Sequence, residues 1–168
     1  MIVSTEVLIQ EKFEEEECPL FDGVLFGTGA IVLMESRTYV GDSGVVGQVR
    51  PLARSTLDSF LEYNPDGWVS FTSLSSSRWE LAGLVLTCGE GSLGADGFVA
   101  VREIDGPLRW IAFFQNSNPF TSVSLAGDEV VALSTLNHLW RFPVDRPEFV
   151  RVTHATREPP EPGRRASS

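Results

Sequence analysis

Gly, Pro, Ser and Asn residues divide this sequence into many short apolar runs, and this punctuation constrains the fold more than any other feature. Short apolar runs between turn-forming residues are typical of β-strands joined by hairpins. Asp105-Gly106 and Gly127-Asp128, for example, suit tight turns between successive strands. The pattern predicts strands near residues 2–9, 23–28, 30–35, 37–41, 44–49, 67–73, 78–88, 97–104, 108–115, 121–126, 129–134, 138–142 and 148–153.

The segment LRWIAFF at residues 108–114 is apolar on both faces of the expected strand. Trp110 and Phe114 point to one face, while Ile111 and Phe113 point to the other. Such a strand belongs at the centre of a sheet that is covered on both sides. One short helix cannot cover both faces, so we expect a second β layer.

Residues 51–64 have the spacing of a helix, because Leu57, Phe60 and Leu61 fall on one helical face. The sequence therefore predicts a mainly β fold that borders on α+β. We expect an antiparallel two-layer or curled sheet built from hairpins, with one helix near residues 52–63 packed on it.

The length of 168 residues predicts one domain with its own core. We expect residues 1–155 to form this single globular β-rich domain. Residues 156–168 are rich in Pro, Arg and Ser and have no apolar periodicity. This composition predicts a disordered tail.

The formal net charge of −10 argues against nucleic acid as a partner, because phosphate binding needs clustered Lys and Arg. No apolar run is long enough to span a bilayer, so no membrane partner is expected. The start of the chain also lacks the basic and apolar regions of a signal peptide. These observations predict a cytoplasmic protein in which Cys18 and Cys88 are reduced. The acidity itself has two interpretations, solubility alone or an electrostatic face for a basic partner.

Two short motifs match known catalytic or cofactor-binding patterns but lack their context. GDSG at residues 41–44 matches the nucleophile segment of chymotrypsin-like serine proteases, yet both histidines, His138 and His154, lie far downstream. GEGSLG at residues 89–94 matches a dinucleotide-binding loop, yet a strand pattern follows it where a helix is needed. Both motifs are therefore predicted to be connections between strands.

The histidines and cysteines have no metal-binding spacing, and His138 is expected at a solvated hairpin tip. We predict no catalytic residues, no bound metal and no cofactor. An enzyme is therefore the less favoured class of protein.

The amide-rich stretch at residues 115–119, QNSNP, is predicted to be the turn joining two strands, with Phe120 folding back onto the core. In the alternative interpretation, Asn116 and Asn118 present their amides to a partner. Phe120 would then anchor the contact beside them.

The stretch WIAFFQNSNPFTSVSLAGDEVVALSTLNHLWRFP, residues 110–143, resembles the Trp/Phe-rich strand–turn–strand segments of immunity proteins from bacterial polymorphic toxin systems. The resemblance implies a protein-binding module that occludes the active site of a cognate toxin. It further implies acidic groups that face a basic toxin domain.

Candidate partner-binding residues follow from turn positions and from the like-charge block near the start of the chain, because side chains at these places are expected to lie in water. Charges of this kind raise the association rate more than the final affinity. The candidates are Glu14, Glu15, Glu16, Glu17, Asp96, Asp105, Asn116, Asn118, Phe120, Asp128 and Glu129.

Two other classes of protein remain open. A small-ligand-binding or enzymatic domain resembling a β-barrel would place a polar cluster in the mouth of the curled sheet. A structural or accessory assembly subunit would use an apolar patch and an exposed edge strand.

Overall fold

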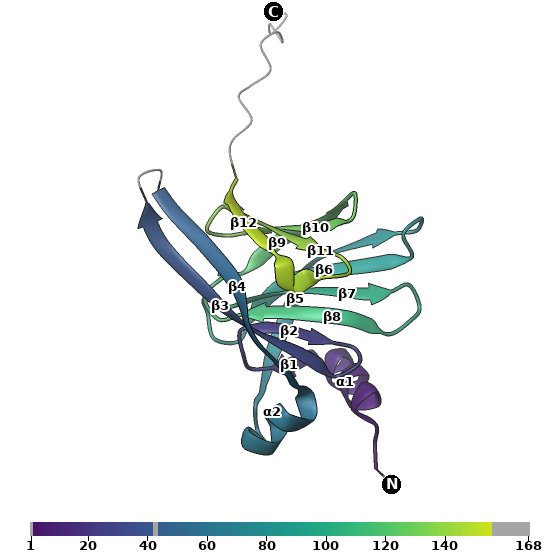
Figure 1. The fold of residues 1–168 in the computed structure, drawn as a ribbon. Helices are drawn as coiled ribbons and strands as arrows, with labels where there is room; N and C mark the ends of the chain where they lie inside the picture. The colour runs from purple at the N-terminus through teal and green to yellow at the C-terminus, as the bar shows by residue number, and fades with distance from the viewer. Residues whose placement is uncertain (1, 42–43, 156–168) are drawn as a thin grey trace, which may run out of the picture.

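The computed structural model describes residues 2–41 and 44–155, which fold into two antiparallel β-sheets and two α-helices (Figure 1). Strands account for 57% of the structure and helices for 14%. The predicted mainly β, antiparallel fold is therefore confirmed. Asp42 and Ser43 of the GDSG motif and the predicted tail at residues 156–168 lie outside the described residues.

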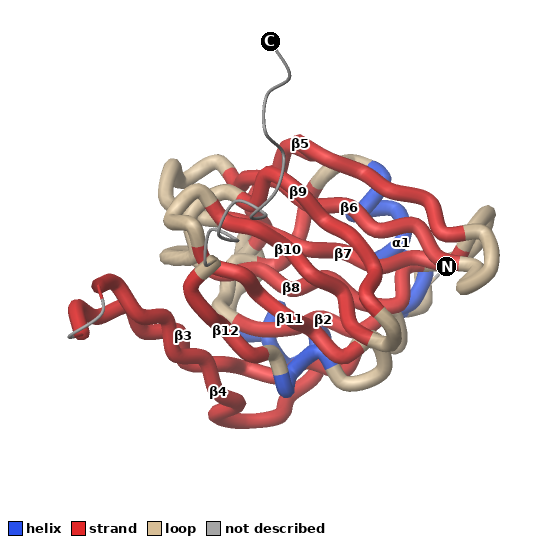
Figure 2. Tube along the Cα trace, turned by 90° about the horizontal axis from the view of Figure 1, so that it is seen from above, coloured by secondary structure: helices blue, strands red, loops and turns tan. Residues whose placement is uncertain are grey.

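The larger sheet has eight strands and forms the middle layer of the molecule. In spatial order its strands are β1 (Glu17–Pro19), β5 (Trp68–Trp79), β6 (Leu84–Gly91), β7 (Gly97–Glu103), β8 (Leu108–Phe114), β2 (Gly23–Phe26), β3 (Ala30–Gly41) and β4 (Gly44–Thr56). The early strand β2 thus lies between β8 and β3. The ends of β3 and β4 project beyond the body of the molecule (Figures 1 and 2).

A smaller sheet lies across one face of the larger one (Figure 2). Its strands, in spatial order, are β12 (Arg151–His154), β11 (His138–Pro143), β10 (Glu129–Ser134) and β9 (Phe120–Ala126). A short 3-10 helix, Pro147–Phe149, joins β11 to β12. Within the described residues the two sheets do not close into a barrel.

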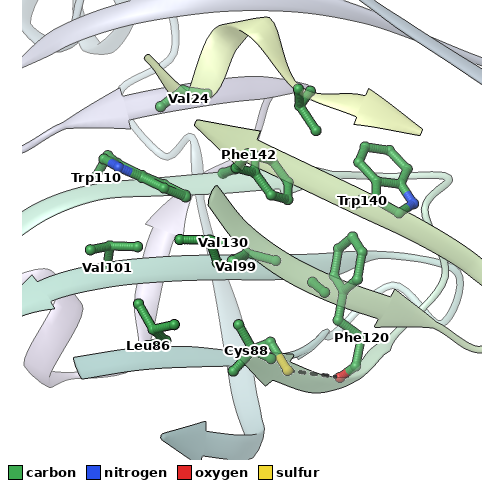
Figure 3. Packing of buried hydrophobic residues seen from close by; sticks show 14 of the residues in the cluster. Val24, Leu86, Cys88, Val99, Val101, Trp110, Phe120, Val130, Trp140 and Phe142 are labelled. Atoms are coloured by element: carbon green, nitrogen blue, oxygen red, sulfur yellow. Dashed lines mark hydrogen bonds between the residues drawn. The ribbon is translucent and has the colours of Figure 1, made fainter. Parts of the chain in front are cut away.

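The space between the two sheets is filled by a hydrophobic core rich in aromatic rings (Figure 3). The ring centroids of Trp110 and Phe142 lie 5.6 Å apart, and those of Phe114 and Trp140 lie 4.9 Å apart. Phe120 meets Trp140 edge to face at 5.4 Å. Tilted and edge-to-face aromatic pairs of this kind add stability beyond the area that they bury.

Two helices cover the opposite face of the larger sheet: α1 (Thr5–Glu14) and α2 (Leu57–Tyr63). Ile9 of α1 and Leu57 of α2 are buried there together with Phe98 and Phe113 of the sheet. Strand β8 therefore has apolar neighbours on both faces, and the predicted central strand is confirmed. None of the described helices is long and apolar enough to cross a membrane.

The predicted hairpin turns are confirmed. Asp105, with φ 53°, lies in the turn between β7 and β8, and Gly127, with φ 63°, lies between β9 and β10. Asn118, with φ 61°, lies in the turn between β8 and β9, where its backbone N–H donates to the Ala95 carbonyl at 2.8 Å. Asn and Asp tolerate this left-handed backbone conformation better than other non-glycine residues.

The prediction of a strand at residues 2–9 is wrong, because this segment begins α1. Ser4 caps the helix, and its hydroxyl accepts a hydrogen bond from the Val7 N–H at 3.3 Å. Ile9 and Phe13 are one helical turn apart and both pack on the core. This tertiary contact outweighs the low helix propensity of the β-branched residues Thr5, Val7 and Ile9 within α1.

The single helix predicted near residues 52–63 is shorter than expected and is not the only one among the described residues. Residues up to Thr56 continue β4 and pair with β3, so α2 begins at Leu57. The cap is Thr56, whose hydroxyl accepts from the Ser59 N–H at 3.2 Å. Residues 52–56, which helical periodicity alone had assigned to the helix, therefore belong to the strand that pairs with β3.

Several strand boundaries also differ from the prediction. Residues 30–41 form one strand rather than two, and β5 runs on to Trp79, so β6 begins only at Leu84. The connection after β6 contains the end of GEGSLG and leads into a strand, as predicted.

His138 is not at a solvated hairpin tip but begins β11 and is 2% exposed. Its ring lies edge to face against that of His154, the opposing residue of β12, at 5.2 Å. Cys18 and Cys88 are free and buried on opposite faces of the larger sheet.

Candidate functional site

The sequence-predicted contact residues do not form one surface. Glu14 ends α1, Glu15 and Glu16 lie in the turn that follows, and Glu17 begins β1. Asp105 lies in the β7–β8 turn. Of the remaining candidates, Asp96 lies in the loop before β7, Asn116 and Asn118 lie in the β8–β9 turn, and Asp128 lies in the β9–β10 turn. Phe120 begins β9 and Glu129 begins β10.

Two of these candidates are buried: the expected exposure of Asp96 is wrong, whereas the predicted packing of Phe120 onto the core is confirmed. Asp96 has no exposed surface, and its Oδ2 accepts from the Leu93 N–H at 3.1 Å. Phe120 also has no exposed surface and packs between the sheets. Turn residues need not lie in water when the turn folds back over the end of a sheet.

A groove of about 650 Å³ lies between α1 and the ends of β2, β7 and β8. We call it the α1 groove. Its apolar floor is lined by the exposed residues Val7 and Pro107, by the edge of the buried Leu108 and by part of Phe26, whose side chain packs against the core between the sheets. Four carboxylates, which we call the acidic rim, belong to Glu6, Glu11, Glu14 and Glu103. The remaining lining residues are Ser4, Gln10, Gly27, Thr28 and Arg109.

Helix α1 is held so that one side faces the core and another faces the groove. Ile9 is 1% exposed, and the Phe13 ring lies 5.6 Å from that of Phe71 in β5. The Thr5 hydroxyl donates to Asp58 Oδ1 of α2 at 2.9 Å, which ties the two helices together. The groove receives at least one residue from each turn of α1, so it follows the helix along its length.

The floor of the groove is fixed by hydrogen bonds that its backbone N–H groups donate. The Leu108 N–H donates to Gln10 Oε1 at 2.9 Å, which joins the start of β8 to α1. The Gly27 N–H donates to the Arg109 carbonyl at 2.9 Å. A β-carbon at residue 27 would lie 2.1 Å from the Leu108 carbonyl oxygen, so only glycine allows this close approach of the two chains.

The acidic rim has no counter-charge of its own. Among residues 2–41 and 44–155, none of its four carboxylates takes part in an ion pair. Arg109 also lines the groove, but its guanidinium already pairs with Asp145 at 2.7 Å. The groove therefore presents net negative charge around an apolar floor, of which Val7 is 47% exposed.

Nearby acids on the other side of α1 are neutralised. Lys12 Nζ lies 2.6 Å from Glu17 Oε2 and 3.4 Å from Glu15 Oε2. The hydrogen bond to Glu17 raises the pKa of the Lys12 ammonium, and the bond to Glu15 acts in the same direction. The like-charge block thus divides in two, because Glu15 and Glu17 pair with Lys12 while Glu14 faces the groove.

Other site types find less support in the structure. Within the part of the chain that the structure describes, no group of three or more His, Cys, Asp or Glu side chains is arranged to hold a metal ion. Edge strand β4 is exposed from Arg50 to Arg54, but it carries Pro51, which has no N–H to pair with an added strand.

Sequence reasoning identified Glu14 and the neighbouring Asp105 but missed most of the groove. Glu6 and Val7 were hidden by the prediction of a strand at residues 2–9, and Glu11 lies in the part of α1 beyond that range, for which no helix was predicted. The available signal was Ser4 as a helix cap before residues with high helix propensity, with Ile9 and Phe13 at i and i+4. Comparisons with protein-family models, curated proteins and solved structures find no match to this chain.

Proposed function

We propose that this chain is a protein-binding module that holds a basic segment of a partner protein in the α1 groove. One observation carries the proposal: an apolar groove is bordered by four carboxylates, none of which takes part in an ion pair among the described residues, and Arg109, which also lines the groove, pairs with Asp145 instead. Apolar contacts supply affinity at an interface, whereas bordering charges steer the partner and set the association rate.

The free chain bears an electrostatic cost at this site. Glu11 lies three residues before Glu14 on α1, and like charges at this spacing repel. Glu14 also lies at the C-terminal end of α1, where the helix dipole disfavours negative charge. A bound Lys or Arg would relieve both effects, which supports a cationic partner over a neutral one.

The partner class follows from the resemblance of residues 110–143 to immunity proteins. In this proposal the partner is a bacterial toxin domain, and the basic segment borders the surface where the toxin binds its own substrate. Occupying that segment would block the toxin without any reaction at the groove.

The test uses toxin domains encoded beside the gene for this chain. Co-expression with this chain should restore growth, and binding measured on a biosensor should weaken as salt rises. The triple variant Glu11→Lys, Glu14→Lys and Glu103→Lys should lose protection and bind more slowly. A control with the same change in net charge, Glu62→Lys, Asp66→Lys and Glu80→Lys, alters exposed acids outside the groove and outside the predicted contact residues and should protect normally.

Absence of binding to every such domain would contradict the proposal. Equal loss of protection in the groove and control variants would also contradict it, because the effect would then come from net charge alone.

The groove volume supports a second candidate function. About 650 Å³ falls within the range of small-ligand sites, and the acidic rim favours a cationic amphiphile. Alkylammonium ions should then raise the melting temperature saturably, whereas alkylcarboxylates of equal length should not. No shift with any chain length would exclude this function.

A further inference from the structure

We propose that the segment bound in the α1 groove is an amphipathic α-helix whose narrow apolar stripe is flanked on both sides by Lys or Arg. This inference rests on the proposed function and adds the conformation and the residue pattern of the partner. Three features of the groove support this inference: the hydrogen bonding of its backbone, its course along α1 and the placement of its charges.

The backbone around the groove is already hydrogen-bonded. The N–H groups of Gly27 and Leu108 donate to the Arg109 carbonyl and to Gln10 Oε1, both at 2.9 Å. The Glu103 N–H donates to the Pro107 carbonyl at 3.1 Å. The walls are strand ends and a helix, so no free strand edge borders the groove among the described residues.

An extended peptide would therefore find no free backbone N–H and C=O groups with which to pair as an added β-strand. Its own N–H and C=O groups would lose water without gaining partners, which costs free energy for each group that is buried. A helical peptide satisfies its backbone internally and offers side chains alone. Of the recurring modes of peptide recognition, the groove accordingly fits a helix that lays its apolar face into a hydrophobic groove.

The course of the groove suits a helix of similar length. Its lining residues on α1 run from Ser4 to Glu14. The ten residues of α1 span about 15 Å, which is nearly three turns. A partner helix of three to four turns could lie along α1, with its apolar side chains directed at Val7 and Pro107.

The rim places negative charge on both sides of the apolar floor. Glu6, Glu11 and Glu14 come from α1, whereas Glu103 comes from the end of β7 on the opposite wall. A complementary helix must therefore carry cations on both sides of its apolar stripe. A helix with all its cations on the face opposite the stripe would place them too far from either wall.

The apolar surface also continues past one end of the groove. Ile2 and Val3 precede Ser4 and are 99% and 55% exposed, and Val7 within the groove is 47% exposed. Exposed aliphatic side chains gathered in this way are typical of contact surfaces. In sequence they directly precede the N-cap of α1.

The experiment measures binding of labelled synthetic peptides of about 14 residues by fluorescence anisotropy at low and high salt. The first peptide is a Leu/Lys sequence with a single Leu stripe flanked by Lys. The second has the same composition in an order that cannot form a stripe. The third carries a central Pro, which breaks the helix, and the fourth replaces every Lys by Glu.

The first peptide should bind at least about tenfold more tightly than the second and third, a difference of about 1.4 kcal/mol. It should become helical on binding, as followed by circular dichroism, and the fourth peptide should not bind. Val7→Asn should weaken binding of the first peptide. Leu74→Asn is the matched control, because Leu74 on β5 is also 47% exposed but lies outside the groove.

The outcomes separate the two proposals. If no basic peptide binds, both the proposed function and the helical partner are wrong. If the first three peptides bind equally and the triple reversal at Glu11, Glu14 and Glu103 abolishes binding, the acidic groove stands but the helical inference is overturned. In a third outcome, the first peptide binds equally well to wild type, to Val7→Asn and to the triple reversal. The binding site would then lie outside the α1 groove, and the helical inference would be overturned as well.

Discussion

The two faces of the eight-stranded sheet are covered in different ways. One face meets a second sheet across a core of large aromatic side chains, and the other meets two helices of ten and seven residues. A sheet can match another sheet over a wide area, whereas two short helices leave part of a wide sheet uncovered. The groove occurs beside α1, at the ends of β2, β7 and β8, where Val7 and Pro107 are exposed to a partner.

The difference implies that one face serves stability and the other serves contact. Loops and elements used for binding are commonly drawn from the less stable parts of a fold. We therefore expect core substitutions between the sheets to affect the whole molecule and changes beside α1 to act locally.

The largest effect is expected for Phe142→Ala between the sheets. The Phe142 ring is fully buried and lies 5.6 Å from that of Trp110 and 6.2 Å from that of Trp140. Removing it should lower the free energy of unfolding by about 3–5 kcal/mol. Phe13→Ala, beneath α1, should cost less than about 2 kcal/mol, because that ring is only half-buried.

Urea unfolding of the two variants tests this difference. Equal losses of stability would show that the helix-covered face is as tightly coupled to the fold as the core between the sheets.

Gly27→Ala should have the next largest effect and should link stability to binding. Its β-carbon would lie 2.1 Å from the Leu108 carbonyl oxygen, so β2 and β8 must move apart. Overpacking of this kind costs about 1–3 kcal/mol. Since Leu108 forms part of the floor, binding of the Leu/Lys peptide should weaken too. A variant with wild-type denaturant midpoint and wild-type affinity would refute the tight packing of the floor.

The two cysteines allow the faces to be compared within one molecule. Cys18 lies in the three-residue edge strand β1 on the helix-covered face, and Cys88 lies in β6 between the sheets. Both are buried, so a thiol reagent reaches them only when the structure opens. At about pH 8 we expect iodoacetamide to label Cys18 about tenfold faster than Cys88, because a short edge strand opens at lower free energy. Mass spectrometry of labelled peptides gives both rates, and equal rates would mean that the faces open together.

The two buried thiols should also make the stability of the fold depend on pH at alkaline values. Burial raises the pKa of both thiols, and that of Cys88 rises from 9.0 to about 12. A raised thiol pKa favours the neutral form in the folded state. Its contribution to stability is fully present below about pH 9 and is lost as the pH rises toward about 12. Replacing Cys88 by Val should therefore flatten the loss of stability over this range.

The smallest effects on stability are expected from neutralising single acidic residues, and the sign of the effect should differ between two of them. Glu14→Gln should raise the free energy of unfolding by up to about 0.5 kcal/mol, since it removes repulsion from Glu11 and an unfavourable charge at the end of α1. Glu35→Gln on β3 should lower stability, because Glu35 accepts a hydrogen bond from Arg50 at 2.6 Å and also pairs with Arg37. Thermal unfolding of both variants at pH 7 tests this difference in sign. A loss of stability in both variants would contradict the proposed repulsion along α1.

The effect of Glu35 should depend on pH. The Arg50 hydrogen bond, with a smaller contribution from Arg37, lowers the pKa of the Glu35 carboxyl below its usual 4.5. A lowered pKa means that the contribution is present above about pH 4.5 and disappears as the pH falls through the folded-state value. Wild type and Glu35→Gln should therefore converge in stability at low pH.

The central strand and the hairpin turns were predictable because their signals are local. Residues 108–114 are apolar in unbroken succession, and the turns contain Asp-Gly, Gly-Asp or Asn-Pro pairs. Helix α1 was not predictable in the same way, since only Ile9 and Phe13 pack on the core and the segment opens with β-branched residues. Its stability comes from packing against strands far along the chain.

The groove was harder to predict than any single element. It joins residues 4–14, 26–28 and 103–109, and their meeting depends on β2 lying beside β8. Periodicity and turn chemistry act over a few residues and do not determine the order of strands in a sheet. Glu14 could be singled out from its charge block, but Glu103 gains its importance only from the strand order.

The position of β2 between β3 and β8 has a consequence for synthesis of the chain. Gly23–Phe26 can pair with β3 as soon as residues 30–33 emerge from the ribosome, but its other edge must wait for Leu108–Phe114. Contacts so distant in sequence slow folding and leave apolar strand edges open to misassembly in the meantime. Both walls of the groove come together only when β8 has docked, so a nascent or truncated chain ending before residue 108 could not yet engage a partner there.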